Sequence, residues 1–74
     1  MATALKVERV KRDLSQEDLV MLTFCKLSQP RISQLERGVT PRLEEVEVLA
    51  KALGMSPREL WPDLAGVEGL EAGE

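Results

Sequence analysis

The chain has 74 residues, a length that supports one small domain with a modest core. Its 43% hydrophobic residues favour a folded domain, and its net charge of −3 gives no general attraction to a polyanion. There is no His and a single Cys, Cys25, which excludes a Cys/His zinc site, a His-dependent catalytic triad and an internal disulfide. We therefore expect neither a metal nor another cofactor.

The lone thiol and the hydropathy pattern indicate the cellular setting. A single Cys fits a reducing cytoplasm, and we expect Cys25 to be a small buried apolar residue. No apolar run reaches the roughly 18 residues of a membrane span, and no signal-peptide pattern opens the chain. These features predict a cytoplasmic protein that does not contact a membrane.

The charge is divided unevenly along the chain. Residues 1–42 hold eight basic and five acidic side chains, a net charge of +3. Residues 43–74 hold two basic and eight acidic side chains, a net charge of −6. Because a binding surface responds first to local charge, the first part is the candidate for contact with an anion.

Capping residues divide the first half of the chain into three helices. Thr3 can cap a helix over about residues 4–12. Ser15 begins a second helix, because an acidic residue three positions later completes a capping box. Ser28 caps a third helix, and Gly38 ends it because glycine enters the left-handed conformation at low cost.

The second half predicts two more helices and a tail. Residues 43–53 carry apolar side chains every three or four positions, which indicates a fourth helix. Ser56 caps a short fifth helix that Pro62 ends. We predict an all-α domain over residues 1–62 and a flexible acidic tail over residues 63–74. The side chains expected to face the core are Leu5, Val10, Leu19, Leu22, Ile32, Leu35, Leu43, Val46, Leu49, Ala50, Leu53, Leu60 and Trp61.

Three segments carry a resemblance to a known family: LSQEDL (14–19), LSQPRISQLERG (27–38) and LEEVEVLAKALGMSPREL (43–60). In this order and spacing they resemble the Cro/repressor or Xre-type helix-turn-helix family, over about residues 4–61. The resemblance implies a five-helix lambda-repressor-like domain whose second and third helices form the DNA-binding motif.

By this resemblance, the helix over residues 29–37 lies in the major groove of DNA. The side chains that it brings to the bases are those of Gln29, Pro30, Arg31 and Gln34. A Gln amide can pair with adenine N6 and N7, and Arg31 can bind guanine O6 and N7 or a phosphate. Pro30 offers only van der Waals contact, for example to a thymine methyl. The alternative is an ordinary solvated helix face.

The resemblance also implies contacts to the DNA backbone, which fix the register without reading the sequence. The residues expected to contact phosphate are Gln16, Ser28, Arg37, Thr40 and Arg42. Gln16 opens the second helix, where its amide and free backbone N–H groups suit a phosphate oxygen.

Arg9 and Glu36 match family positions that form a partly buried ion pair between the first and third helices. The alternative for Glu36 is a solvated carboxylate. If the pair forms, loss of one partner costs several kcal/mol, because the other charge is left unpaired.

One segment departs from the family pattern. VMLTFCK (20–26) is two residues longer than usual, and Lys26 stands where the turn normally has glycine. The second helix extends by half a turn, or the turn is a longer loop. If Met21, Phe24 and Cys25 are exposed, they offer a contact to another protein.

The leading functional hypothesis is a sequence-specific DNA-binding transcriptional regulator, most simply a repressor that binds an inverted-repeat operator as a homodimer. Leu60 and Trp61 are the expected dimer contacts, with plain core as their alternative. The second hypothesis is a helix-turn-helix interaction module, antitoxin-like or anti-regulator, that acts through a regulatory protein partner. We expect no enzyme, because the sequence has no His, no metal cluster and no glycine-rich phosphate loop.

Overall fold

The computed structural model describes residues 3–62, and all of the regular elements in that part are helices. They are α1 (Ala4–Lys11), α2 (Gln16–Leu22), α3 (Gln29–Glu36), α4 (Leu43–Leu53) and α5 (Pro57–Leu60). This confirms the predicted all-α fold. The predicted tail over residues 63–74 lies outside the described residues. None of the described helices is long and apolar enough to cross a membrane.

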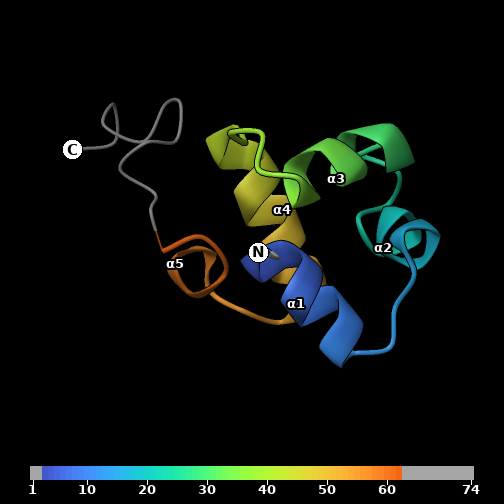
Figure 1. The fold of residues 1–74 in the computed structure, drawn as a ribbon, viewed down its shortest axis with the longest axis horizontal. Helices are drawn as coiled ribbons and strands as arrows, with labels where there is room; N and C mark the ends of the chain where they lie inside the picture. Colours follow the sequence, from blue (N-terminus) through green and yellow to red (C-terminus); the bar gives the residue numbers. More distant parts are fainter. Residues whose placement is uncertain (1–2, 63–74) are drawn as a thin grey trace.

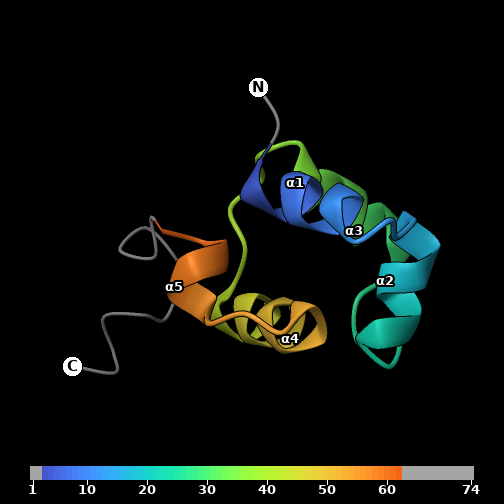
Figure 2. The ribbon, with the colours of Figure 1, turned by 90° about the horizontal axis from the view of Figure 1, so that it is seen from below.

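The helices form two layers (Figures 1 and 2). α1 lies alongside α3 in one layer, α4 and α5 form the other, and α2 closes one end next to α3. Side chains from all five helices meet between these layers. The buried apolar residues are Leu5, Leu19, Leu27, Ile32, Leu35, Val46, Leu49, Ala50, Leu53 and Leu60.

Local capping explains where the helices begin. Thr3, Ser15, Ser28 and Ser56 are N-caps, and the side chain of each accepts a hydrogen bond from a backbone N–H in the first helical turn. Such bonds join residues only three positions apart, so the sequence predicts these starts directly. At the other end of α4, Gly54 takes the left-handed conformation with a φ of 73°.

Two residues expected in the core are exposed, and both corrections have the same cause. Val10 is 57% exposed and Leu22 is 43% exposed. In each helix a polar side chain four positions after a buried leucine turns inward instead. Arg9 follows Leu5 in α1, and Thr23, which is almost fully buried, follows Leu19 at the end of α2.

The end of α2 is built without glycine. Phe24 and Cys25 both have left-handed backbones, with φ values of 56° and 61°. The N–H of Cys25 donates to the carbonyl of Val20 at 2.9 Å, and that of Phe24 to Met21 at 2.9 Å. These are the two bonds of a Schellman motif, in which Phe24 holds the position that glycine usually takes.

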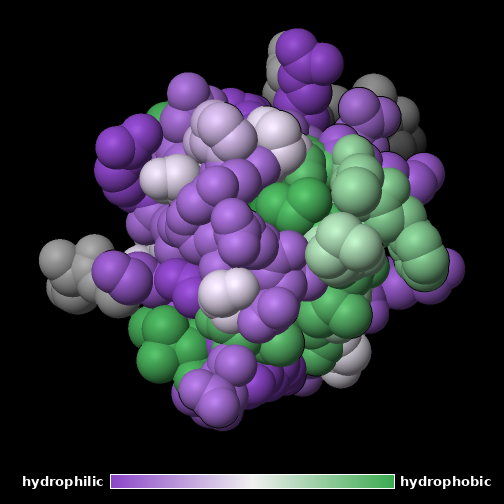
Figure 3. Space-filling view, turned by 90° about the vertical axis from the view of Figure 1, so that its right-hand side faces the viewer, coloured by the Kyte–Doolittle hydropathy of each residue, from purple (hydrophilic) through white to green (hydrophobic). Residues whose placement is uncertain are grey.

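This turn corrects one expectation, the burial of Cys25, and shows where the chain reverses direction. The left-handed residues are Phe24 and Cys25 rather than Lys26, which stands where the family usually has glycine. Cys25 is exposed rather than buried, and the Phe24 side chain is 85% exposed. With Met21 and Leu22, these residues form an apolar patch at the end of α2, and Figure 3 shows hydrophobic side chains gathered beside a hydrophilic area on this side.

Candidate nucleic-acid interface

Helix α3 has a buried side and an exposed side. Ile32 and Leu35 are completely buried and fix the helix to the core. Gln29, Pro30 and Gln34, which were predicted to meet the bases, all have exposed side chains. The helix therefore presents polar groups to solvent while its position is set from the other side.

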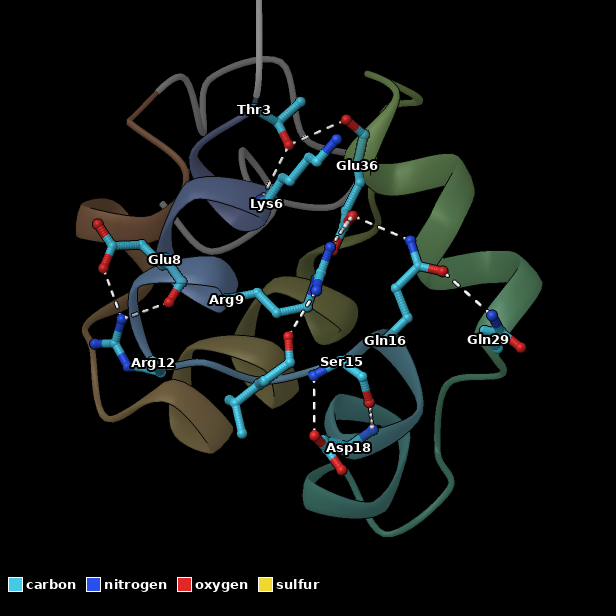
Figure 4. A network of polar contacts seen from close by, with 11 residues as sticks. Thr3, Lys6, Glu8, Arg9, Arg12, Ser15, Gln16, Asp18, Gln29 and Glu36 are labelled. Atoms are coloured by element: carbon cyan, nitrogen blue, oxygen red, sulfur yellow. Dashed lines mark hydrogen bonds and ion pairs between the residues drawn. The ribbon is translucent and has the colours of Figure 1, made fainter.

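An ion pair between Arg9 and Glu36 joins α3 to α1. Arg9 Nε lies 2.6 Å from Glu36 Oε2, and Arg9 Nη2 donates to Glu36 Oε1 at 3.1 Å. Arg9 Nη1 also donates to the carbonyl of Leu14 at 2.6 Å, which ties in the loop before α2. Glu36 is only 7% exposed, so this bidentate pair is largely shielded from water (Figure 4).

The charge state of Glu36 follows from these contacts. Burial raises the pKa of its carboxyl. The hydrogen bonds from Arg9 and Gln16 and the nearby positive charges lower this pKa by a larger amount. The net result is a pKa below the ordinary value. Glu36 is therefore ionised at neutral pH and forms an ion pair with Arg9.

Gln16 lies between the buried ion pair and the exposed side of α3. Its Nε2 donates to Glu36 Oε1 at 3.1 Å, and its Oε1 accepts a hydrogen bond from Gln29 Nε2 at 3.3 Å (Figure 4). Sequence reasoning assigned Gln16 to phosphate and missed this bridging position. This bridge links the exposed amide of Gln29 to the buried carboxylate of Glu36 and so restricts its orientation. One N–H of Gln16 remains for a further acceptor.

A second ion pair, between Arg31 and Glu45, was not predicted. Arg31 Nε lies 2.8 Å from Glu45 Oε2, and Arg31 Nη2 donates to Glu45 Oε1 at 2.8 Å. Glu45 Oε1 also accepts the backbone N–H of Arg42 at 2.8 Å, at the start of α4. The sequence signal for Glu45 is an acidic residue in the third position of a helix, which indicates an N-terminal cap and not an ion pair with another helix.

The pKa of Glu45 lies below its ordinary value. The hydrogen bond from Arg31 is the main cause, burial opposes it, and the bond from the Arg42 backbone adds to it. The same hydrogen bond raises the pKa of Arg31, against a smaller effect of burial. Both partners are therefore charged at neutral pH.

The residues predicted to contact phosphate lie around both ends of α3. Ser28 is exposed at its start, and Arg37, Thr40 and Arg42 are exposed after its end. A groove between the start of α3 and α4 is lined in part by Lys26, Arg31 and Arg42, together with Glu44 and Glu45. Sequence reasoning did not assign Lys26 to this surface.

The predicted dimer contacts lie elsewhere and differ from each other. Leu60 is completely buried in the core, so its side chain faces away from any partner in this conformation. Trp61 is partly buried and packs against the core cluster that contains Val46. A dimer contact in this segment therefore depends on Trp61 and stays a prediction.

The fold and the exposed polar side of α3 define a helix-turn-helix domain of the DNA-binding regulatory class, which is not typically enzymatic. A family model described as Helix-turn-helix matches residues 5–60, and the chain belongs to this family, of the Xre/Cro type. No curated protein and no solved structure matches the chain significantly. Within residues 3–62, no group of three or more His, Cys, Asp or Glu side chains is placed to hold a metal ion.

Proposed function

We propose that the protein is a sequence-specific transcriptional repressor that binds an inverted-repeat operator as a homodimer. Helix α3 enters the major groove of each half-site, and the half-sites lie about one helical turn, ~34 Å, apart. The observation that carries this proposal is the division of α3 into a buried side at Ile32, Leu35 and Glu36 and an exposed side at Gln29 and Gln34.

The homodimer follows from the size of the reading surface. One short helix reaches too few base pairs to distinguish an operator from the many competing sites in a genome. A second copy doubles the number of base pairs that are read and makes the operator an inverted repeat. We expect Trp61 to contribute to the contact between copies, and its partial exposure at the end of α5 is compatible with this role.

Selection of bound duplexes from a random pool tests the proposal directly. We expect enrichment of an inverted repeat whose half-sites match the helical spacing of a dimer. Binding to random duplex DNA should also weaken steeply as salt concentration rises. Enrichment of single half-sites would contradict the homodimer, and an absence of salt-sensitive affinity at low ionic strength would contradict DNA binding altogether.

Gln34 offers a test of base reading. Gln34→Ala should relax the base preference at one position per half-site and cost about 1–3 kcal/mol there, because an exposed amide on α3 is lost. The operator positions read by residues other than Arg31 serve as the internal control, because Arg31 Nη1 donates to Gln34 Oε1. An equal loss on all sequences would assign Gln34 to positioning rather than to base reading.

Arg42 offers a test of phosphate contact. Arg42→Ala should weaken binding to all sequences and lower the slope of log affinity against log salt by about one. Arg58→Ala is the matched control, because Arg58 is an exposed arginine on α5, away from the groove beside α3. An unchanged slope in Arg42→Ala would remove this residue from the phosphate contacts.

A second candidate function is favoured by the apolar patch at the end of α2. Met21, Leu22, Phe24 and Cys25 are all exposed there, which suits contact with a regulatory protein partner. An antitoxin-like or anti-regulator module would act through such a partner. Substitution of Phe24 should then impair function in the cell while leaving operator affinity unchanged, whereas the repressor proposal requires operator affinity itself.

A further inference from the structure

The guanidinium group of Arg31 is held by Glu45 and by Gln34, and two of its five N–H groups remain for another acceptor. A guanidinium carries five N–H groups. Two of these, on Nε and Nη2, point to the carboxylate of Glu45, and one on Nη1 donates to Gln34 Oε1 at 3.3 Å. One N–H on Nη1 and one on Nη2 remain, and the Arg31 side chain is 27% exposed.

Glu45 is itself held in place by helix α4. Its side chain is 13% exposed and accepts the backbone N–H of Arg42 as well as the two N–H groups of Arg31. The direction of the Arg31 fork is therefore set by α4, which packs against the rest of the core through Val46 and Leu49. The guanidinium of an arginine held in this way has a fixed orientation, whereas that of a free surface arginine rotates.

We infer that Glu45 is a positioning residue that aims the Nη1–Nη2 edge of Arg31 at a guanine in each operator half-site. The inference rests on the proposed function, in which α3 lies in the major groove. Two adjacent N–H donors match the O6 and N7 acceptors of guanine, whereas adenine presents an acceptor beside a donor. A guanidinium fixed before binding discriminates between these edges more sharply than a mobile one.

The charges around Arg31 favour a base over a phosphate. Glu45 neutralises the positive charge of the guanidinium, and Glu44 lines the same groove. A phosphate oxygen would lie close to two carboxylates and meet a side chain with little net charge. The hydrogen-bond donors of Arg31 remain, however, and a neutral base edge needs donors rather than net charge.

The test compares base preference in matched variants. Random-pool selection with the wild-type chain and with Arg31→Ala identifies the guanine position, where we expect a preference of about tenfold that Arg31→Ala abolishes. Glu45→Gln should reduce that preference to about twofold and leave unchanged the position read by Gln29, which is held by Gln16 rather than by Arg31. Glu44→Gln removes the same charge from the same turn of α4 without touching Arg31, and should retain the full preference.

The variants also separate positioning from folding. Gln at position 45 keeps an acceptor for the Arg42 N–H, and the thermal midpoint from circular dichroism checks that the domain is folded. If Glu45→Gln does not fold, Glu45→Asp keeps the charge but withdraws the carboxylate from Arg31, and should reduce the guanine preference in the same way. A loss confined to one base position is not expected from general destabilisation.

The outcomes distinguish this inference from the proposed function. Full guanine preference in folded Glu45→Gln, or a stronger one, would overturn the role of Glu45 while leaving the repressor proposal intact. Uniform loss of affinity in Arg31→Ala, with no change in base preference, would make Arg31 a phosphate ligand and would also overturn the inference. If the wild-type chain selects no sequence at all, the proposed function fails and the inference fails with it.

Discussion

Replacing Arg9 with alanine leaves the carboxylate of Glu36 buried without its arginine. The substitution removes the hydrogen bonds from Arg9 to Glu36, at 2.6 and 3.1 Å, and the bond to the Leu14 carbonyl at 2.6 Å. Gln16 remains as a donor to Glu36, but its amide carries no charge. Arg9→Ala should therefore destabilise the domain more than any loss of a surface ion pair.

The magnitude follows from the burial of the pair, whose side chains are 12% and 4% exposed. Breaking a buried ion pair by removing one partner costs about 3–5 kcal/mol, because the remaining charge has lost its solvation and its partner. A domain of this length has a total stability of roughly 4–11 kcal/mol. Arg9→Ala should therefore remove roughly a quarter or more of the total stability of the domain.

Urea denaturation measures the effect. The fluorescence of Trp61, the single tryptophan, reports on packing at α5, and far-UV circular dichroism reports on all helices. Arg12→Ala is the matched control, since it removes an arginine that pairs with Glu8 at the surface of α1. A loss below about 1 kcal/mol in Arg9→Ala would refute the reasoning. So would a double variant, Arg9→Met with Glu36→Met, that is no more stable than Arg9→Ala alone.

Three further predictions concern stability. Burial raises the pKa of Glu36, but the hydrogen bonds from Arg9 and Gln16 hold it below its ordinary value of 4.5. The contribution of Glu36 to the free energy of unfolding is therefore fully present above that pH and is lost as pH falls through the folded pKa. Glu36→Gln should accordingly flatten the fall in the free energy of unfolding below about pH 5, and a slope equal to that of wild type would contradict this. Phe24→Gly should raise the free energy of unfolding by about 0.5–1 kcal/mol relative to Phe24→Ala. Both variants remove the exposed ring, but only glycine takes a φ of 56° without strain. Equal urea midpoints for the two variants would argue against strain at this turn. Leu49→Ala should cost about 2–5 kcal/mol by leaving a cavity in the core, whereas Val39→Ala at the surface should change the urea midpoint little; similar losses for the two would contradict the assignment of the core.

The helix boundaries could be predicted because their causes are local. Ser15, Ser28 and Ser56 each bond to a backbone N–H three residues away, so the signal and its effect lie in the same short stretch of sequence. The predicted fourth helix over residues 43–53 agrees with α4, since a regular apolar spacing runs along it and Gly54 marks its C-terminal end.

The contacts that shape the candidate interface could not be predicted in the same way. Arg31 and Glu45 are 14 residues apart, and Gln16 and Glu36 are 20 apart, so their pairing depends on how whole helices pack. The turn at Phe24 gave no signal either, because the sequence has no glycine there. Hydrophobic spacing also misplaced Val10, since it carries no information about a charged side chain that turns inward beside it.

The pairing of Arg31 with Glu45 bears on how binding specificity can change through mutation. Gln29 and Gln34 are exposed on α3, and neither bonds directly to a carboxylate, so we expect substitutions there to have a small cost to folding. Under the proposed function, such substitutions would alter base preference. Arg31 differs, because any neutral replacement leaves the partly buried carboxylate of Glu45 with the Arg42 backbone N–H but without the charge of Arg31. Under the proposed function, a change of base preference at that position is favoured by two coordinated substitutions, one in each helix, and we expect positions 31 and 45 to vary together among related proteins.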